Sequence, residues 1–446
     1  MTIAKPPAKP HSSKSMIVFA STLGTTIEWY DFFLYGVLTP LALNRLFFPN
    51  MSPVMGTLAA YTTFAVGFIS RPVGGIIFGH YGDRLGRKTI LIMTMMIMGG
   101  ATFLIGALPT TASVGIVAPI LLLLLRIMQG IGIGGEWGGA VLMTIEHAPK
   151  GKRSLYGSWP QLGVPLGLMS SAGVVALLNL LPDTAFIAWG WRVAFFASAL
   201  LVAIGLYVRL KILETPDFER ARAENKIVPV PFLDLIKNYK REVLLTLGAR
   251  YVEGACFNTF GVFIIYYVTH SLGLTRGQAL NAVIISSAVM LPFIIIAGML
   301  ADRFGLKRVF ALGTVSIALS TIVSFWLMDT YGANHYGVVV LAIILPFSLA
   351  YPLVYGTESS LFASQFDAHV RYSGVSFAYQ FSGIFASGLT PLIATALIDA
   401  GGGKPWLVVL YVLGVAIVSL ISVLLMNGIS KGSSSLSEPG ALQAAG

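Results

Sequence analysis

Long apolar runs separated by short polar turns are the main feature of this chain of 446 residues. An α-helix rises about 1.5 Å per residue, so roughly 20 consecutive apolar residues cross the hydrocarbon core of a bilayer. The predicted spanning segments are 16–41, 57–80, 89–108, 113–143, 155–181, 190–211, 243–268, 279–300, 307–328, 335–364, 372–399 and 405–427. The pattern therefore predicts an all-α polytopic membrane protein with twelve transmembrane helices.

The composition excludes an ordinary soluble domain. Hydrophobic residues make up 56% of the chain and charged residues only 11%, whereas soluble domains carry about 25% charged residues. With a cytoplasmic N-terminus, only Arg45, Arg276 and Lys404 among the lysines and arginines fall in external loops. The positive-inside rule then places both termini in the cytoplasm. The net charge of +10 suits anionic lipid headgroups and requires no nucleic-acid partner.

A tight basic turn occurs twice, at equivalent places in the two halves of the chain. Its first copy is GHYGDRLGRK at 79–88, and its degenerate second copy is GMLADRFGLKR at 298–308. A duplicated turn indicates two structurally related halves, as in many transporters. The predicted organisation is a cytoplasmic N-terminal tail (1–15), a six-helix bundle (16–211), a cytoplasmic linker (212–242), a second six-helix bundle (243–428) and a cytoplasmic C-terminal tail (429–446).

The two turns carry charges that are suited to closing the cytoplasmic side of a transporter. Glycines allow successive helices to end close together, and Asp83 can lie against the positive N-terminus of a neighbouring helix. The simpler interpretation is a loop that only sets topology, or a solvated cluster whose ion pairs contribute at most about 1 kcal/mol each. The predicted gating residues are Asp83, Arg84, Gly86, Arg87, Lys88, Glu146, Arg153, Asp302, Arg303, Lys307 and Arg308.

Charged residues inside the predicted spans are costly to bury and therefore point to function. Glu28 and Asp31 lie three residues apart, hence on one face of the first span. They are candidate proton carriers, or else part of a buried ion pair that locks the bundle. Arg71 lies near the middle of the second span beside Pro72, which is expected to kink the helix. We expect Glu28 or Asp31 to be the acidic partner of Arg71.

Arg126 begins a glycine-rich stretch of the fourth span, RIMQGIGIGG. The glycines allow a neighbouring helix to approach closely. We expect Arg126 either to line the transport cavity or to form a structural pair with the first span. A guanidinium is always charged and can bind a carboxylate through two parallel hydrogen bonds, so it suits an anionic substrate.

Several stretches resemble one known family. The first basic turn matches G-x-x-x-D-[RK]-x-G-[RK]-[RK], the signature loop of the major facilitator superfamily, and Arg-x-x-Gln-Gly-x-Gly-x-Gly from Arg126 resembles a motif of its proton-coupled members. Within the superfamily, the chain resembles the metabolite:proton symporter family. The stretches that carry this second resemblance are EWYDF (28–32), QGIGIGGEWGGAVLMTIEH (129–147) and YGSWPQLG (156–163). The resemblance implies the major facilitator fold and a carrier of shikimate, 2-oxoglutarate, citrate or other organic acids, or of proline and betaine.

We therefore predict a secondary transporter that takes up a small organic acid together with a proton by alternating access. The acid would be a mono-, di- or tricarboxylate of the shikimate or 2-oxoglutarate type. The predicted substrate-binding residues are Tyr30, Arg71, Arg126, Gln129, Arg250, Asn258, Tyr379 and Gln380, and the predicted proton-coupling residues are Glu28, Asp31 and Glu136. An alternative is uptake of a zwitterion such as proline or betaine, whose cationic group Glu253 and Glu358 would hold. Export of a drug or metabolite is less favoured.

Other functional classes lack the residues that they need. A nucleotide-driven pump requires G-x-x-x-x-G-K-[ST], which this sequence does not contain. The six histidines show no metal-ligand spacing, and one cysteine, Cys256, cannot form an intramolecular disulfide. We predict a carrier rather than an enzyme, with no metal and no cofactor beyond the coupling proton. The expected partners are a small-molecule substrate and the lipid bilayer, and we expect a monomer in a bacterial inner membrane.

Overall fold

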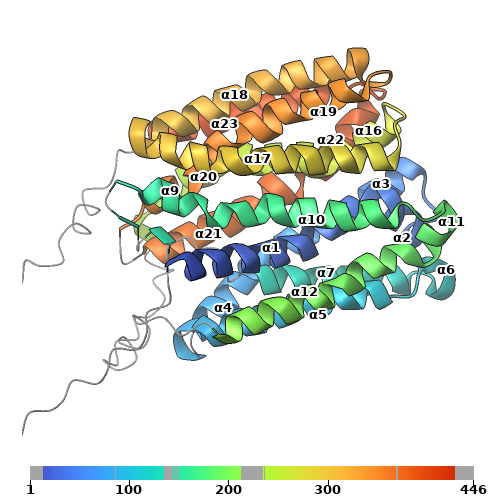
Figure 1. Cartoon of the computed structure of the whole chain (residues 1–446), viewed down its shortest axis with the longest axis horizontal. Coiled ribbons are helices and arrows are strands. Elements are labelled where there is room, and N and C mark those ends of the chain that lie inside the picture. The colour runs from blue at the N-terminus through green and yellow to red at the C-terminus, as the bar shows by residue number, and fades with distance from the viewer. Residues whose placement is uncertain are drawn as a thin grey trace, which may run out of the picture.

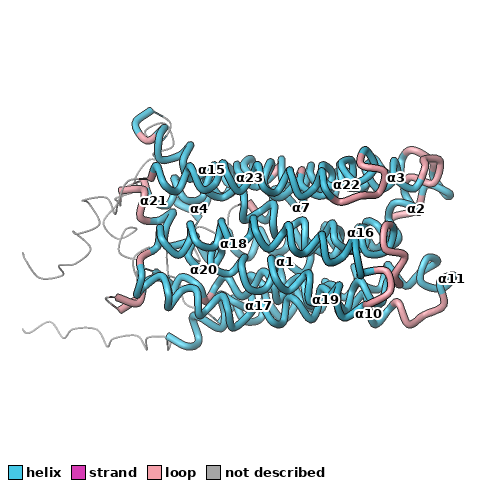
Figure 2. The backbone as a smooth tube through the Cα atoms, turned by 90° about the horizontal axis from the view of Figure 1, so that it is seen from above, coloured by secondary structure: helices cyan, strands magenta, loops and turns pink. Residues whose placement is uncertain are grey.

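The computed structural model is a bundle of long helices that run roughly along one axis (Figure 1). It describes residues 14–85, 87–134, 144–145, 148–149, 151–211, 235, 237–367 and 370–426. Within these ranges every regular element is helical. The view from above shows the same parallel arrangement, with loops at the two ends of the bundle (Figure 2). This architecture confirms the predicted all-α polytopic fold.

Helices from the first half of the chain occupy the lower part of the bundle in Figure 1. These elements are α1 (Lys14–Leu38), η1 (Thr39–Leu43), α2 (Asn44–Phe47), α3 (Pro53–Ile69), α4 (Arg71–Leu85), α5 (Arg87–Ala107), α6 (Thr111–Val114), α7 (Val117–Ile133), α9 (Arg153–Ser158), η2 (Pro160–Leu162), α10 (Gly163–Leu178), α11 (Asp183–Ala185), η3 (Phe186–Gly190) and α12 (Trp191–Lys211). Within this group α1 packs against α10 and α12, and α5 packs against α7 and α12.

Most helices from the second half of the chain, coloured yellow to red, lie above the first group in Figure 1. These elements are α15 (Lys240–Asn258), η4 (Thr259–Phe263), α16 (Ile264–His270), α17 (Arg276–Phe304), α18 (Leu306–Leu327), η5 (Met328–Gly332), α19 (Tyr336–Ile344), η6 (Leu345–Ala350), α20 (Tyr351–Ala363), α21 (Arg371–Gly383), η7 (Ile384–Gly388), α22 (Thr390–Ala400) and α23 (Trp406–Leu425). Within this group α15 packs against α23, and α18 packs against α20 and α23.

Each predicted span falls on helices of the structure. In the described chain, nine helices are long and apolar enough to cross a membrane, and the shorter apolar helices Ile92–Ala107 and Val117–Ile133 lie in the third and fourth predicted spans. The second span is interrupted at Ser70, between α3 and α4, in agreement with the kink expected at Pro72. The end of the fourth span and most of the predicted linker and tails lie outside the described residues.

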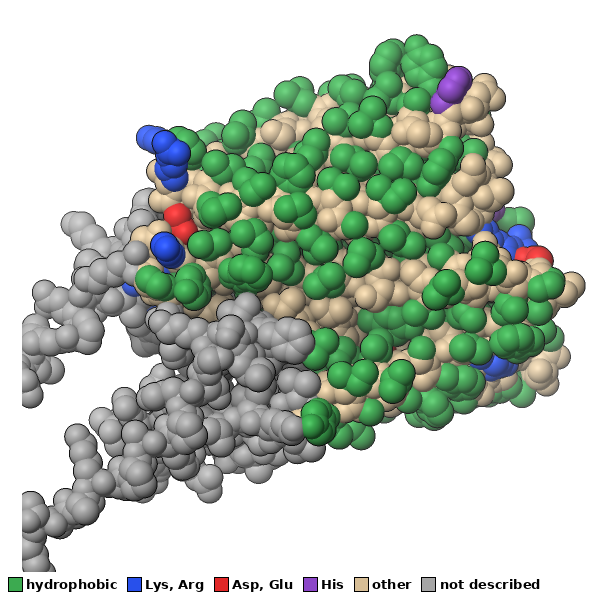
Figure 3. Space-filling view, viewed as in Figure 1, with side chains coloured by type: hydrophobic (Ala, Val, Ile, Leu, Met, Phe, Trp, Pro, Cys, Tyr) green, Lys and Arg blue, Asp and Glu red, His purple; other side chains and the backbone are tan. Residues whose placement is uncertain are grey.

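The long sides of the bundle are apolar. Figure 3 shows hydrophobic side chains along these sides and charged side chains gathered at the two ends. Leu180, Leu200, Leu319, Leu410 and Leu424 are among the large apolar side chains that are mostly exposed. A continuous apolar surface of this kind is unstable in water, so the sides of the bundle face lipid chains.

The two halves of the molecule contact each other at several levels. Helix α10 packs against α17, and α9 packs against α17 and α20. A second set of contacts joins α3 to η7 and α22, and α4 to α21. Phe33 of α1 stacks on Phe257 of α15, with ring centroids 5.0 Å apart. These contacts close the two halves around a buried centre.

Glycines bring α7 directly against the region where α3 ends and α4 begins, as the sequence predicted. A methyl group at Gly130 would overlap the Ser70 hydroxyl and the Gly67 carbonyl oxygen. A methyl group at Gly134 would overlap the carbonyl oxygen of Arg71. The backbone of α7 therefore touches the helix break that positions Arg71.

We expect Gly130→Ala to lower the apparent Tm of the purified protein, because the two backbones must separate to admit the methyl group. Overpacking of a core costs about 1–3 kcal/mol. Gly100→Ala is the matched control, since the Cβ position of Gly100 has open space around it. Thermal unfolding of both variants, followed by tryptophan fluorescence, measures the difference. Equal Tm values for the two variants would contradict the backbone contact.

Candidate transport site

Arg71 is the first residue of α4 and is only 1% exposed. Its guanidinium carbon lies 3.9 Å from the ring centroid of Phe68, 4.1 Å from that of Phe32 and 5.0 Å from that of Trp29. The Nε and Nη2 atoms of Arg71 are buried without a hydrogen-bond partner. A buried guanidinium therefore rests on aromatic rings and keeps unused donors.

Three aromatic rings surround the guanidinium of Arg71, and its ion pair with Glu28 or Asp31 stays a prediction. Desolvated cation–π contacts contribute about 2 kcal/mol, but they do not satisfy N–H donors. A buried donor without an acceptor costs about 1–3 kcal/mol, and more when it is charged. This arrangement favours the arrival of an acceptor, such as the carboxylate of a bound anion.

Arg71 lies at the boundary between the two halves. The ring nearest to Arg71 is that of Phe68. A Cβ atom placed on Gly383 of α21 would lie 3.5 Å from the Phe68 ring and 3.4 Å from Nη1 of Arg250. The positive charges of Arg250 and Arg126 both act on Arg71. Three buried arginines therefore approach one another across the centre of the molecule.

Arg126 is fully buried in α7. Its Nη1 donates to Oε1 of Gln129 at 2.7 Å, and its Nη2 donates to the carbonyl oxygen of Phe64 at 3.3 Å. Its guanidinium carbon lies 4.4 Å from the ring centroid of Tyr35 and 4.6 Å from that of Phe32. The structure thus brings Arg126 and Gln129 together beside the first span, and the Phe32 ring contacts the guanidinium groups of both Arg71 and Arg126.

Asp31 is 1% exposed, and its Oδ1 atom has no hydrogen-bond partner. The hydroxyl groups of Thr102 in α5 and Ser198 in α12 lie beside the carboxylate. Thr102 Oγ1 accepts a hydrogen bond of 2.6 Å from Nε2 of Gln129. A continuous row of polar side chains therefore leads from Asp31 through Thr102 and Gln129 to Arg126. Sequence reasoning missed Thr102 and Ser198.

The other predicted residues of the first half differ in position. Glu28 is buried, and its charge acts on Asp31. The hydroxyl group of Tyr30 donates to the carbonyl oxygen of Ala194 at 2.8 Å, so this hydroxyl is engaged inside the first half and the structure does not bring it to the arginines. Glu136 lies outside the described residues.

A second buried charge cluster forms around Arg250 in the second half. Its Nη2 lies 3.4 Å from Oε2 of Glu253, and its Nε lies 3.3 Å from Oε1 of Glu358. Its Nη1 donates to the Ser382 hydroxyl at 3.2 Å, and its guanidinium carbon lies 3.7 Å from the ring centroid of Tyr379. Helices α15, α20 and α21 thus converge on one guanidinium.

Two tyrosines extend this cluster. The Tyr351 hydroxyl donates to Oε1 of Glu253 at 2.7 Å. The Tyr355 hydroxyl, Oε2 of Glu253 and both carboxylate oxygens of Glu358 are buried without a hydrogen-bond partner of suitable geometry. Sequence reasoning missed the role of Tyr351, because the partner of its hydroxyl group, Glu253, lies 98 positions away along the chain.

Asn258 and Gln380 were also predicted to bind substrate. Nδ2 of Asn258 donates to the carbonyl oxygen of Gly254 at 2.9 Å, and its Oδ1 has no partner. Nε2 of Gln380 donates to the carbonyl oxygen of Gly134 at 3.0 Å. Gln380 therefore joins α21 to the end of α7 and holds the two halves together.

At one end of the bundle, Asp302 of α17 lies against the N-terminus of α9. Its two carboxylate oxygens accept hydrogen bonds from the backbone N–H groups of Ser154 at 2.9 Å and Leu155 at 3.0 Å. The sequence predicted such a contact for Asp83 of the first basic turn, whose side chain lies outside what the structure describes; the structure shows it for Asp302 of the second turn. The Ser360 hydroxyl adds a weaker bond of 3.4 Å to the carbonyl oxygen of Arg153. These bonds close this end of the molecule by joining its two halves.

The remaining predicted gating residues do not all reach this contact. Lys307 donates to the carbonyl oxygen of Met426 at 2.6 Å, within the second half. Arg303 and Arg308 are exposed. Gly86, Glu146 and the side chains of Asp83, Arg84, Arg87 and Lys88 lie outside what the structure describes.

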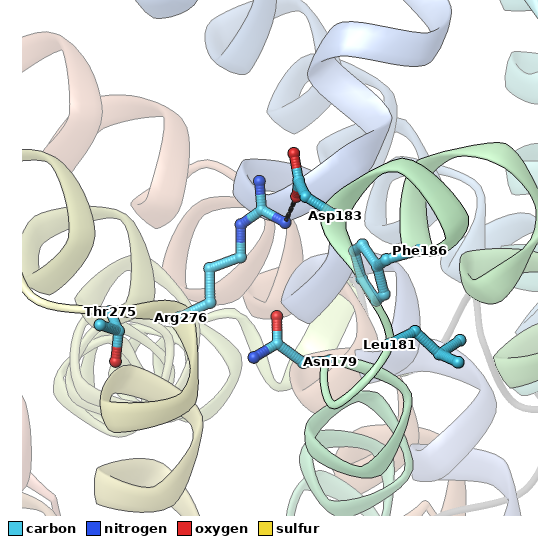
Figure 4. A pocket seen from close by; sticks show the side chains of 6 residues that line it. All are labelled: Asn179, Leu181, Asp183, Phe186, Thr275 and Arg276. Atoms are coloured by element: carbon cyan, nitrogen blue, oxygen red, sulfur yellow. Dashed lines mark hydrogen bonds and ion pairs between the residues drawn. The ribbon is translucent and has the colours of Figure 1, made fainter.

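The opposite end of the bundle is joined by an exposed ion pair. Arg276, the first residue of α17, lies 2.5 Å from Asp183 of α11, and their side chains are 20% and 64% exposed. The two residues border a cavity of about 250 Å³ between the halves (Figure 4). The other residues that line it are Asn179, Leu181, Phe186 and Thr275. Sequence reasoning placed Arg276 in an external loop and missed this pair.

We expect Asp302→Ala to open the end of the molecule that Asp302 closes. Hydrogen bonds to a charged group contribute about 1.5–3 kcal/mol each, so losing two of them should increase opening at least about tenfold. A reporter, Ser360→Cys in a Cys256→Ala background, would measure opening by its rate of maleimide labelling. Asp329→Ala is the control, because Asp329 pairs with Lys404 inside the second half. Equal labelling rates in both variants would contradict a gating role for Asp302.

The structure has the features of a polytopic membrane transporter. Its apolar helices pack in two groups, buried arginines and carboxylates lie at the boundary between them, and the groups contact each other at both ends. The family model described as Major Facilitator Superfamily matches residues 21–388 and 251–441. The chain belongs to this superfamily and, by its relatives, to the metabolite:proton symporter type within it. It is accordingly a carrier and not an enzyme, and a multi-pass protein of the inner-membrane type.

Three relatives illustrate this placement. The chain is 39% identical to the shikimate transporter of Escherichia coli K12, over 91% of this chain and 93% of that protein. It is 39% identical to the inner membrane metabolite transport protein YhjE of the same organism, over 94% and 95% of the two chains. It is 34% identical to the Escherichia coli K12 proline/betaine transporter, over 91% and 82%. Relatives of similar identity thus carry names from both predicted substrate classes.

Solved structures support the fold. The crystal structure of a D-xylose-proton symporter superposes with a TM-score of 0.73 at 18% sequence identity, over 94% of this chain and 99% of that one. An inward-open, partially occluded form of the xylose transporter XylE from E. coli gives a TM-score of 0.71, also at 18% identity, over 92% and 96%. At this identity the likeness concerns the arrangement of helices alone.

Proposed function

We propose that the protein takes up a small organic acid together with a proton. The observation that carries this proposal is Arg71, a buried guanidinium between the halves whose Nε and Nη2 donors have no hydrogen-bond partner. Arg126 also has a buried Nε without a hydrogen-bond partner. Guanidinium groups bind carboxylates through strong, charge-assisted hydrogen bonds. A small carboxylate held between the halves would supply the missing acceptor.

A proton is a suitable partner for such a substrate. An anion that enters a cell works against the membrane potential, which acts with about 2.3 kcal/mol per charge per 100 mV. A proton carried with the anion removes this cost. We assign the proton-carrying role to Asp31, assisted by Glu28 and Glu136, because the row of polar side chains through Thr102 and Gln129 connects Asp31 to Arg126.

Transport then proceeds by alternating access. In our proposed orientation both termini are cytoplasmic, so the Asp302 contact closes the inside and the Arg276–Asp183 pair closes the outside. Breaking one set of contacts while keeping the other allows the two halves to rock about the central arginines. The identity of 39% to a protein named as a shikimate transporter supports a carboxylate as the substrate. The protein would function in this way as a monomer.

Thermal stabilisation of the purified full-length protein tests the substrate class. The panel is shikimate, 2-oxoglutarate, citrate, proline and betaine, each measured at acidic and at neutral pH. A ligand at a hundred times its Kd stabilises the folded state by about 2.7 kcal/mol. We expect a carboxylic acid to raise the Tm, more strongly at acidic pH, and Arg71→Gln to remove the shift.

The competing substrate class is a zwitterion. Glu253 and Glu358 are two buried carboxylates beside a single guanidinium, and carboxylates can hold the cationic group of proline or betaine. A Tm shift with betaine or proline, but with none of the three acids, would favour this second function and contradict the first.

A further inference from the structure

The cluster around Arg250 holds two carboxylates in contact with one guanidinium. Glu253 lies 3.4 Å and Glu358 lies 3.3 Å from Arg250, and the side chains of the three residues are 5%, 0% and 2% exposed. A single guanidinium neutralises only one carboxylate. Because a second buried ionised carboxylate is costly, neighbouring carboxylates in proteins often hold one proton between them.

Several further groups act on the two carboxylates, and they come from both halves of the molecule. They are Arg71 of α4, Cys256 of α15, Tyr351 and Tyr355 of α20, and Tyr379 of α21. Tyr351 satisfies one oxygen of Glu253, whereas neither oxygen of Glu358 has a hydrogen-bond partner. Glu358 is therefore the better proton acceptor of the two carboxylates.

We infer that Glu253 and Glu358 form a proton-binding site that controls the binding of an anion at Arg250. This inference rests on the proposed uptake of an organic acid. With both carboxylates ionised, their two negative charges balance the positive charges of Arg250 and Arg71. An anion approaching these four groups then gains no net attraction.

A proton on Glu358 breaks this balance. It removes one negative charge and releases the Nε edge of Arg250 from its ion pair. The four groups then carry one net positive charge, and the unused donors of Arg71 and Arg250 can hold a substrate carboxylate between the halves. A hydronium ion in solution gives its proton to a carboxylate oxygen of Glu358 and becomes a water molecule. Proton binding and anion binding thus favour each other, as linkage requires.

Isothermal titration calorimetry over a range of pH tests this inference, with shikimate, 2-oxoglutarate and citrate as separate probes of the full-length protein. For a probe that binds, we expect wild-type affinity to fall as the pH rises, by up to about tenfold per pH unit for one linked proton. Glu358→Gln is permanently neutral at this position, so its affinity should stay high and its pH dependence should be clearly weaker than that of the wild type. Glu253→Gln should also weaken the pH dependence, and it provides a second test if Glu358→Gln fails to fold.

The controls separate this site from other carboxylates. Glu242→Gln neutralises a carboxylate in the first turn of the same helix α15, and it should keep the wild-type pH dependence. Asp31→Asn should keep the pH dependence of the affinity that arises from Glu253 and Glu358. The inference is overturned if Glu358→Gln keeps the full wild-type dependence, or if Asp31→Asn alone removes it. Failure of the wild-type protein to bind any of the three acids would refute the proposed function, and the inference with it.

Discussion

Replacing Arg126 by alanine is expected to abolish uptake of the proposed organic acid while the protein remains folded. Arg126 is fully buried, it binds Gln129, and its Nε has no hydrogen-bond partner. Removing one member of a buried, hydrogen-bonded charge pair costs about 2–5 kcal/mol, so the Kd for the acid should rise at least about thirtyfold. Calorimetric binding and counterflow in proteoliposomes would measure this loss.

Two further variants make the Arg126 result interpretable. Arg126→Lys keeps the charge but loses the planar fork of donors, so it should bind the acid more weakly than the wild type and more tightly than Arg126→Ala. Arg45→Ala removes an exposed arginine at the end of the bundle and should transport normally. Normal transport by Arg126→Ala would exclude Arg126 from the substrate site and leave it a structural role beside Phe32 and Tyr35.

Asp31→Asn is expected to separate substrate movement from the proton gradient. The asparagine has the shape of a protonated aspartate but cannot release a proton, so exchange of substrate across the membrane should continue. Accumulation driven by an imposed pH gradient should fall strongly, because Asp31 no longer returns a proton on the inner side. Asp31 is nearly fully buried, so the change should act locally.

Uptake and exchange measured in the same proteoliposomes test this expectation. Asp399→Asn, an exposed carboxylate at the end of α22, is the control and should keep both activities. Full accumulation by Asp31→Asn under a pH gradient would show that another carboxylate carries the transported proton. Loss of both exchange and accumulation would instead place Asp31 in substrate binding.

Much of the fold could be predicted because a membrane imposes a simple rule on the sequence. Every backbone polar group must be satisfied inside its own segment, so long apolar runs become helices, as they do in α17 and α23. Local chemistry also predicted the helix break before Arg71 and the close approach of α7 through Gly130. Arg126 and Gln129 are adjacent on one helix, so their contact follows from a spacing of three residues.

The partners of the other charges could not be predicted from spacing. Arg250 contacts Glu358 and Ser382, which lie on two different helices far along the chain. A π-helical turn, η6, precedes Tyr351 and Glu358 in their span. A π turn shifts every later side chain around the helix axis. A pattern read with a period of 3.6 residues therefore assigns the wrong face to residues beyond such a turn.

The two ends of the bundle are closed by bonds of different kinds, and they should respond differently to dissolved salt. Ions screen exposed charges within about 8 Å at physiological ionic strength, so they weaken the exposed Arg276–Asp183 pair. They have less effect on Asp302, whose carboxylate is bonded directly to the backbone of α9. In the proposed orientation, a high salt concentration outside the cell would weaken the Arg276–Asp183 pair and leave the Asp302 contact intact. The resting conformation of this carrier would then depend on the salinity of the medium in which the cell lives.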